Sequence, residues 1–132
     1  MAKTYLIDTS AVIKYLNETL PDSGLKFIDG IIDQESILSF ISEIDLQVWT
    51  PPNEQDLDVY RLFVYQAEII GIDEGIIAET IRIRKSYQLK LPDAVIAATA
   101  ITHNLTLIAD NDKDFTKVTA LKYINPNKKL YE

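Results

Sequence analysis

Short β-prone apolar runs alternate with stretches of helical spacing along the whole chain, and this alternation constrains the fold most strongly. Runs typical of buried strands lie at residues 5–7, 37–41, 68–72, 106–109 and 121–124. Helical spacing predicts helices at 11–16, 25–32, 42–49, from Asn53 or Asp56 onward, at 73–87 and at 92–103. Strands that are separated by helices usually pair in parallel, so we predict an α/β fold with a mostly parallel sheet covered on both faces.

Length, charge and composition narrow the class of protein further. The 132 residues fit a single domain, 1–132, and the absence of cysteine excludes disulfides and thiolate zinc sites. No apolar run approaches the ~20 residues of a membrane-spanning helix, and the first residues lack the pattern of a signal peptide. We therefore expect a soluble, cytoplasmic protein. The net charge of −7 weighs against binding to nucleic acid by charge alone.

Acidic residues stand where several of the predicted strands end. Asp8 ends the first strand, Asp93 begins a helix that is apolar almost all round, and others follow two more strands: Glu43, Asp45, Asp110, Asp112 and Asp114, with Asn111 among them. The carboxyl ends of parallel strands meet at one edge of a sheet. Each acid alone could be a helix cap or a turn residue, worth about 1 kcal/mol. Together they would repel one another unless a cation balanced them, and an all-oxygen ligand set suits Mg²⁺ or Mn²⁺.

The helix after the second strand offers two acids for such a site. Ser42 and Asp45 are three positions apart and share a helix face, whereas Glu43 is rotated by about 100° from Ser42. If Ser42 faces the site, Asp45 faces it too. We therefore prefer Asp45 as the second acid and keep Glu43 as the alternative, because both could also simply lie in the first turn of a capped helix.

Four segments form an ordered set of motifs: YLIDTSAVI at 5–13, SFISEIDL at 39–46, LPDAVIAATA at 91–100 and LIADNDKDF at 107–115. In this order and at these distances they resemble the motifs of the PIN-domain ribonucleases, especially the VapC-like toxins of type II VapBC toxin–antitoxin pairs. In the family's second motif a Ser or Thr precedes the acid by three positions, so Asp45 matches it, with Asp where Glu is usual. In the last motif, Ala109 stands where Thr is common and Asp110 where a basic residue is common.

The resemblance implies a PIN-like three-layer α/β/α sandwich and a Mg²⁺- or Mn²⁺-dependent endoribonuclease. It also implies an RNA substrate, an inhibitory antitoxin and a homodimer. By the same resemblance Asp8, Asp93 and Asp114 hold the metal, while Asp45 orients or deprotonates the attacking water or holds a second ion. The supporting residues are Thr9, Ser42 and Asn111, of which the two hydroxyl groups would bind carboxylates or a phosphate oxygen.

Basic residues on both sides of the last two motifs could contact RNA phosphates, although a solvated surface is the plainer interpretation of each: Arg82, Arg84, Lys85 and Lys90, then Lys113, Lys117 and Lys122. Rival functions remain open. A dehalogenase-type phosphatase needs a second Asp where Ser10 stands, and a receiver domain usually has adjacent acids where Asp8 is followed by Thr9. The remaining alternative is a PIN-like scaffold that binds RNA or a protein partner with weak or no catalysis.

Overall fold

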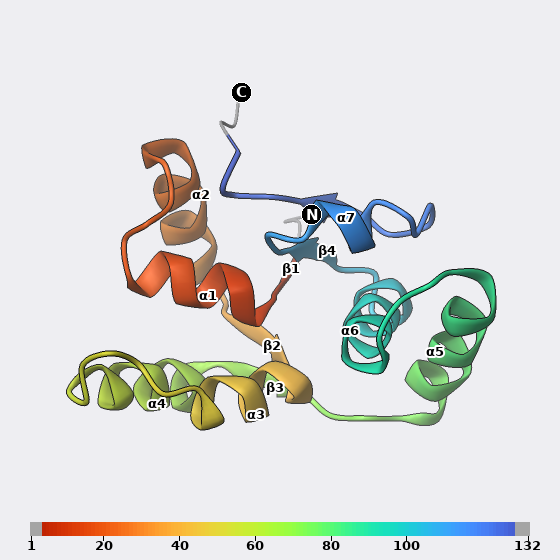
Figure 1. The fold of residues 1–132 in the computed structure, drawn as a ribbon, viewed down its shortest axis with the longest axis horizontal. Helices are drawn as coiled ribbons and strands as arrows, with labels where there is room; N and C mark the ends of the chain where they lie inside the picture. The colour runs from red at the N-terminus through yellow and green to blue at the C-terminus, as the bar shows by residue number, and fades with distance from the viewer. Residues whose placement is uncertain (1–3, 129–132) are drawn as a thin grey trace.

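The computed structural model describes residues 4–128 and shows short parallel strands at the centre of the molecule (Figure 1). The strands are β1 (Tyr5–Ile7), β2 (Ile37–Ser39), β3 (Glu68–Ile70), β4 (Thr106–Ile108) and β5 (Tyr123–Ile124). One parallel ladder has the order β1-β4-β5, and a second parallel ladder joins β2 to β3. Because β1 also lies against β2, the two ladders adjoin. The prediction of a mostly parallel sheet is confirmed, with the sheet divided into two ladders.

Helices connect the strands in the alternating order that the sequence predicts. They are α1 (Thr9–Leu16), α2 (Asp22–Ile32), α3 (Phe40–Val48), α4 (Asp56–Gln66), α5 (Glu74–Ser86), α6 (Leu91–Thr102) and α7 (Asp112–Phe115). Within residues 4–128, no helix combines the length and the apolar character that crossing a membrane would require.

Two apolar cores lie on opposite faces of the strands, because successive strand residues point in opposite directions. Leu6 and Leu107 pack with α5 and α6 on one face. Their neighbours Ile7 and Ile108 pack with α1, α2, α3 and α4 on the other face. Figure 1 shows these two groups of helices on either side of the strands. The prediction of a three-layer α/β/α sandwich is confirmed.

The boundaries of two elements differ from the sequence prediction. β2 ends at Ser39 rather than at Ile41, because the Ser39 hydroxyl accepts the backbone N–H of Ile41 at 3.1 Å and caps α3. The acid-rich segment 110–114 after β4 has the composition of a polar turn, but part of it forms the short helix α7, whose first backbone bond runs from Phe115 N–H to the Asn111 carbonyl at 3.1 Å.

Candidate active site

Asp8 lies between β1 and α1, and only 8% of its surface is exposed. Its backbone N–H donates to the Ile108 carbonyl at 2.9 Å, and its own carbonyl accepts the first N–H groups of α1. Burial raises the pKa of Asp8 to about 6, and the nearby charge of Asp93 adds to this effect. Hydrogen bonds from the Ser10 hydroxyl and from backbone N–H groups act in the opposite direction. Asp8 is thus a buried carboxyl group whose ionised form a cation would stabilise.

Asp93 is affected by the charges of acids from two other elements. It lies in the first turn of α6, where Lys90 is the N-cap residue. Burial raises the pKa of Asp93, the charge of Asp114 raises it further, Lys90 lowers it, and Asp45 raises it. Since Asp93 in turn raises the pKa of Asp8, the structure brings Asp8, Asp45, Asp93 and Asp114 into one electrostatically coupled group. These four acids come from segments that are far apart in the sequence.

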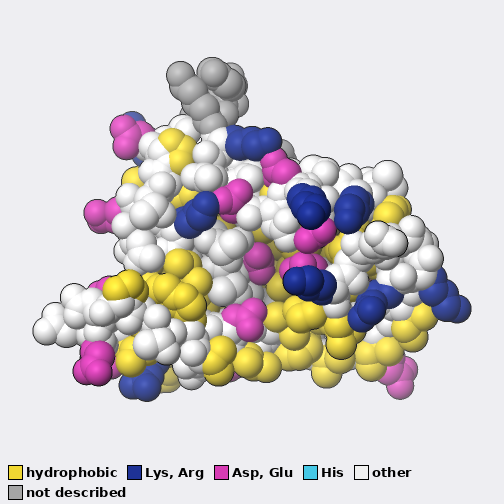
Figure 2. All heavy atoms as spheres, in the orientation of Figure 1, with side chains coloured by type: hydrophobic (Ala, Val, Ile, Leu, Met, Phe, Trp, Pro, Cys, Tyr) yellow, Lys and Arg dark blue, Asp and Glu magenta, His cyan; other side chains and the backbone are white. Residues whose placement is uncertain are grey.

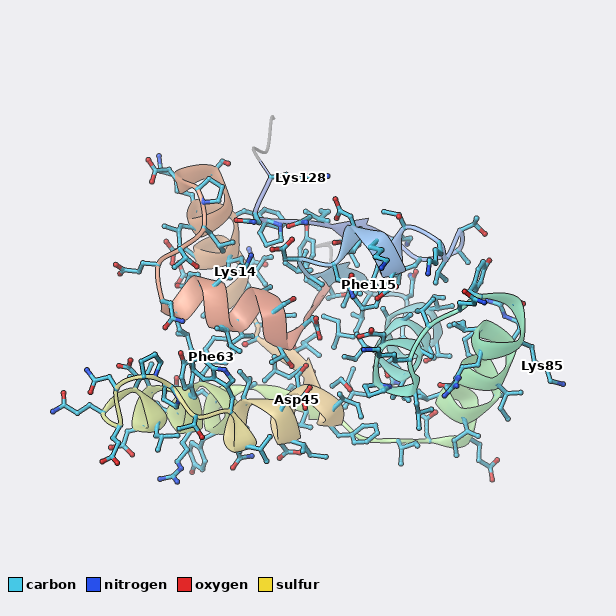
Figure 3. The ribbon with its side chains drawn as sticks, in the orientation of Figure 1. Lys14, Asp45, Phe63, Lys85, Phe115 and Lys128 are labelled. Carbon is cyan, nitrogen blue, oxygen red and sulfur yellow. The ribbon has the colours of Figure 1, made fainter. Side chains whose placement is uncertain are left out.

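Asp45 reaches this group from α3, and the Thr9 hydroxyl links it to α1. The Thr9 hydroxyl lies 3.1 Å from Ser42 Oγ and 3.5 Å from Asp45 Oδ2, and Ser42 is fully buried. Figure 3 shows Asp45 on the part of α3 that lies toward the middle of the molecule. Because α3 begins at Phe40, Glu43 lies in its first turn and Asp45 does not, which corrects the prediction that both do.

Asp114 differs from Asp8 and Asp93 because it already has polar partners. The Asn111 side-chain amide donates to Asp114 Oδ2 at 3.1 Å, and Lys117 Nζ lies 3.4 Å from Asp114 Oδ1. The hydrogen bond from Asn111, with a smaller contribution from Lys117, lowers the pKa of Asp114. These contacts therefore favour the ionised form of Asp114, and Asn111 fixes its orientation.

Asp110 belongs to a network that the sequence did not reveal. Its carboxylate pairs with Lys14 of α1 and accepts hydrogen bonds from the amides of Asn125 at 2.8 Å and Asn127 at 3.2 Å. Its backbone N–H donates to Ser10 Oγ at 3.1 Å. Ser10 and Lys14 are four positions apart and so lie on one face of α1. This spacing is the only sequence signal that the two residues share a partner. Asp110, at the position where the family commonly has a basic residue, is thus paired with a cation from α1.

The four coupled acids could hold a metal ion only with the help of further ligands such as water. Within residues 4–128, no three Asp, Glu or His side chains are grouped closely enough to hold an ion by themselves. The donor set still fits Mg²⁺, because this ion is commonly held by one or two carboxylates and keeps several of its waters. Asp8 and Asp93 satisfy that requirement, since each is disfavoured as a free anion and each lies near further negative charge.

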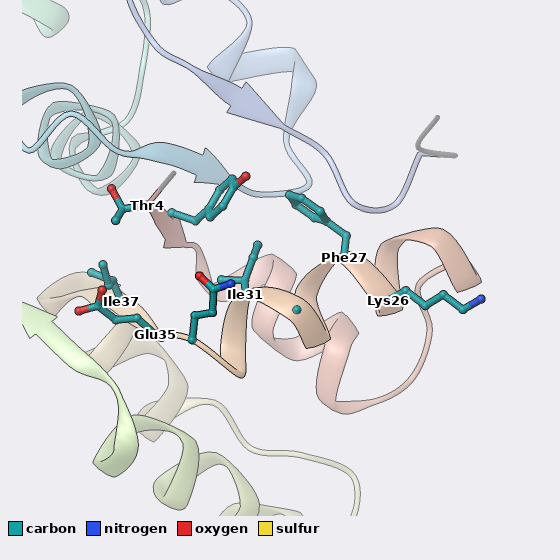
Figure 4. Close-up of a pocket in the computed structure, with 9 residues that line it drawn as sticks. Thr4, Lys26, Phe27, Ile31, Glu35 and Ile37 are labelled. Atoms are coloured by element: carbon teal, nitrogen blue, oxygen red, sulfur yellow. The ribbon is translucent and has the colours of Figure 1, made fainter. Parts of the chain in front are cut away.

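Charge is distributed unevenly over this face of the molecule. Figure 2 shows acidic side chains near the middle of the face and basic side chains gathered around and to the right of them. A separate hollow of about 460 Å³ lies at the opposite edge of the sheet, where Thr4, Tyr5 and Ile37 begin the strands and Phe27 and Glu35 complete the wall (Figure 4). None of the predicted site residues lines that hollow.

Fold and site together define a parallel α/β domain with an acidic centre at the carboxyl edge of its sheet. The sequence matches the PIN domain family over residues 5–121, and the chain therefore belongs to this family, whose members are nucleases. The resemblance drawn from the four motifs is confirmed. None of the curated proteins matches the chain by sequence.

Solved structures of similar fold include chains of several toxin–antitoxin complexes. A chain of a toxin–antitoxin complex from Klebsiella pneumoniae is 27% identical, with a TM-score of 0.73 over 93% of this chain and 98% of that chain. A chain of VapBC2 from Rickettsia felis, bound to a DNA fragment from its promoter, is 23% identical. Its TM-score is 0.75, and the match covers 92% of this chain and 98% of that chain. A chain of VapBC-1 from nontypeable Haemophilus influenzae is 22% identical. Its TM-score is 0.75, and the match covers 95% of this chain and 99% of that chain.

Proposed function

We propose that this PIN domain is a metal-dependent endoribonuclease that hydrolyses RNA phosphodiester bonds. One observation carries the proposal: four acids from four separate segments are coupled through Asp93, which is affected by the charges of Asp45 and Asp114 and itself acts on the buried Asp8. A fold gains nothing in stability from gathering carboxylates that raise one another's pKa values, so such a cluster is typical of a functional site. Membership of a nuclease family supports the same reaction class.

The acids divide into proposed roles according to their surroundings. Asp8 and Asp93 would hold Mg²⁺ or Mn²⁺ directly, and Asp114, oriented by Asn111, would complete the site through water. When bound, such an ion activates water and neutralises charge on a phosphate. Asp45, oriented by the Thr9 hydroxyl, would accept the proton of the attacking water. Glu43 is the weaker candidate for this role, because the hydrogen bond from Thr9 reaches Asp45.

Ser42 would support the same step without touching the reacting atoms. Its buried hydroxyl lies within hydrogen-bond distance of Thr9 and holds α3 against α1. The distance between Asp45 and the metal-holding pair therefore depends on this contact. We regard Thr9 and Ser42 as positioning residues for Asp45.

The proposed biological role is that of the toxin in a VapBC-type pair, acting in the cytoplasm as a homodimer of single-domain chains and inhibited by an antitoxin. The likeness to a chain of the Klebsiella pneumoniae toxin–antitoxin complex supports a protein partner. Exposed apolar side chains on α3 and α4 also support one: Ile44, Val48, Val59, Leu62 and Tyr65. Grouped apolar side chains on a surface are typical of protein contacts.

The decisive experiment compares cleavage of a labelled single-stranded RNA by the wild-type chain and by Asp8→Asn and Asp93→Asn, in Mg²⁺ and in EDTA. We expect each substitution, and EDTA, to abolish cleavage while the circular dichroism spectrum stays unchanged. Asp58→Asn is the matched control, since Asp58 is an exposed acid on α4. Full cleavage by the purified Asp8→Asn/Asp93→Asn double variant would end the proposal.

A catalytically weak scaffold that binds RNA or a protein partner is the second candidate. It is favoured by one observation: no three metal-binding side chains are grouped within the described part of the chain. Calorimetric titration with Mn²⁺ separates the two functions. Binding that is lost in Asp93→Asn supports the nuclease, and the absence of binding by the wild-type chain supports the scaffold.

A further inference from the structure

A second hollow lies beside the candidate active site, between the end of α5 and the start of α6. It measures about 440 Å³ and is lined by Arg84, Tyr87, Gln88, Leu89 and Lys90. Arg84 and Lys90 are exposed, and the Tyr87 ring is half-buried. The lining therefore combines two cations and an aromatic ring in one open depression.

Two interactions connect this hollow to the acids of the site. Lys90 lies near enough to Asp93 for its charge to lower the pKa of that carboxyl group. Lys117 Nζ donates to the Gln88 carbonyl at 3.1 Å and lies 3.4 Å from Asp114 Oδ1. One lysine thus bridges the wall of the hollow and the acidic centre.

The Tyr87 ring is held in place at its hydroxyl end. Its hydroxyl lies 3.3 Å from the Thr119 hydroxyl, within hydrogen-bond distance. This hydrogen bond, and to a smaller degree the charge of Arg82, lowers the pKa of Tyr87. A ring fixed at its hydroxyl end loses little further freedom when a flat group stacks on it.

We propose that this hollow binds a nucleotide of single-stranded RNA next to the nucleotide at the cleavage position, with Arg84 and Lys90 on its phosphates and Tyr87 stacked on its base. The inference rests on the proposed function and identifies where the substrate lies. A chain of net charge −7 with an acidic centre needs local cations to hold a polyanion. Cations interleaved with an aromatic ring are the usual surface for single-stranded nucleic acid.

Salt-dependent binding of a short fluorescein-labelled RNA, measured in EDTA so that no hydrolysis occurs, tests the phosphate contacts. Arg84→Gln/Lys90→Gln is compared with Lys26→Gln/Arg61→Gln, which removes the same charge. Arg61 is exposed on α4, and Lys26 lies on α2 at the opposite edge of the sheet (Figure 4). For single strands, each lost phosphate contact lowers the slope of log affinity against log salt by ~0.7. We expect the slope to fall by ~0.7 to ~1.4 in Arg84→Gln/Lys90→Gln, for one or two lost contacts, and to stay unchanged in the control variant.

Tyr87→Leu tests the stacking contact separately. We expect RNA affinity to fall about 5- to 100-fold with an unchanged salt slope, because stacking is not electrostatic. Tyr87→Phe should restore most of the affinity, since it keeps the ring and removes only the hydroxyl. A loss of equal size in Tyr87→Phe would show that the hydroxyl contact matters and would overturn the stacking assignment.

Further results bear on the RNA-binding assignment and on the proposed function. Equal salt slopes in the two double variants, or no RNA binding by the wild-type chain, would overturn the inference. An oligoglutamate of matched charge that loses affinity in the same variant to the same degree would identify an acidic protein segment as the ligand instead of RNA. If the wild-type chain binds the RNA as expected but does not cleave it in Mg²⁺, the proposed function fails and the binding surface stands.

Discussion

Ser10 donates its hydroxyl hydrogen to Asp8 Oδ2 at 3.1 Å. Ser10 Oγ also accepts the backbone N–H of Asp110 at 3.1 Å, so the loop after β4 fixes the hydroxyl group. Because a serine hydroxyl has one hydrogen, the N–H that it accepts directs this hydrogen toward Asp8. Ser10 thus orients the buried carboxyl group, a role that the sequence alone does not indicate.

Replacing Ser10 by Ala removes a hydrogen bond that lowers the pKa of Asp8. We expect the pKa of Asp8 to rise from about 6 to roughly 7, because the free energy of one hydrogen bond to a charged group corresponds to a pKa change of roughly 1. Titration of the Asp8 carboxyl carbon by NMR measures the effect. Ser10→Thr keeps the hydroxyl and should leave the pKa near its wild-type value. An unchanged pKa in Ser10→Ala would show that the hydroxyl does not act on Asp8.

Asp8→Asn should stabilise the metal-free protein at neutral pH. The pKa of Asp8 rises from 3.8 to about 6 on folding, so the native state binds its proton more tightly than the unfolded chain does. The stability that this proton contributes is complete below about pH 4 and is lost as the pH rises through about 6, a change of roughly 3 kcal/mol. We expect Asp8→Asn to raise the free energy of unfolding by about 1–3 kcal/mol at neutral pH in EDTA, measured by urea unfolding.

The pH dependence is the control for that prediction. The difference between Asp8→Asn and the wild-type chain should shrink as the pH falls to about 4 and below, because Asp8 is then protonated in the folded state and becomes protonated in the unfolded chain as well. Asp58→Asn, at an exposed acid, should show little difference at either pH. A gain in stability that is the same at all pH values would contradict the assignment to Asp8 ionisation.

The ion pair between Lys14 and Asp110 should contribute more to stability than an exposed pair does. Lys14 and Asp110 are partly buried, with side-chain exposures of 36% and 21%, whereas Arg61 and Asp58 of α4 are exposed at 65% and 88%. Double-mutant cycles with Lys14→Met and Asp110→Asn should yield a coupling energy of about 1 kcal/mol. The matched cycle at Arg61 and Asp58 should yield less than about 0.5 kcal/mol. Equal coupling at both pairs would rule out a structural role for the first.

Two glycines of α2 should respond to alanine in opposite directions. A Cβ atom at Gly24 would lie 2.0 Å from the Pro126 carbonyl oxygen, whereas one at Gly30 would meet nothing within 4 Å. Gly24→Ala should destabilise the protein by about 1–3 kcal/mol. It should also displace Pro126 and the neighbouring Asn125, whose side-chain amide donates to Asp110. Gly30→Ala should stabilise it by about 0.5–1 kcal/mol, because alanine restricts the unfolded chain. Thermal unfolding of both variants checks the signs.

The sequence pattern predicted the layers of the fold because burial on both faces leaves a strong apolar signal. The helix that begins near Asp93 is the clearest case, since residues 94–100 are all buried in α6. The end of β2 was missed for a physical reason: Phe40 and Ile41 continue the apolar run, and only the Ser39 cap ends the strand. Short apolar runs do not distinguish a strand from the first turn of a helix.

The site was predictable only in part. Strand ends and helix geometry were enough to select Asp8, Asp93 and Asp45, because each position follows from local structure. The partners of Asp110 were not predictable, since Lys14 lies 96 positions before it and Asn125 lies on a segment that folds back over α7. Such long-range polar contacts leave no periodic signal in a single sequence.

Anomalous diffraction from crystals soaked in Mn²⁺ tests the central claim most directly, because it locates the ion relative to the acids. We predict one or two manganese peaks within ligand distance of Asp8 and Asp93, with Asp45 and Asp114 reached directly or through water, and no such peak in Asp93→Asn. Wild-type crystals without manganese at this position, or with manganese bound only elsewhere on the surface, would contradict a shared metal site and the nuclease mechanism built on it.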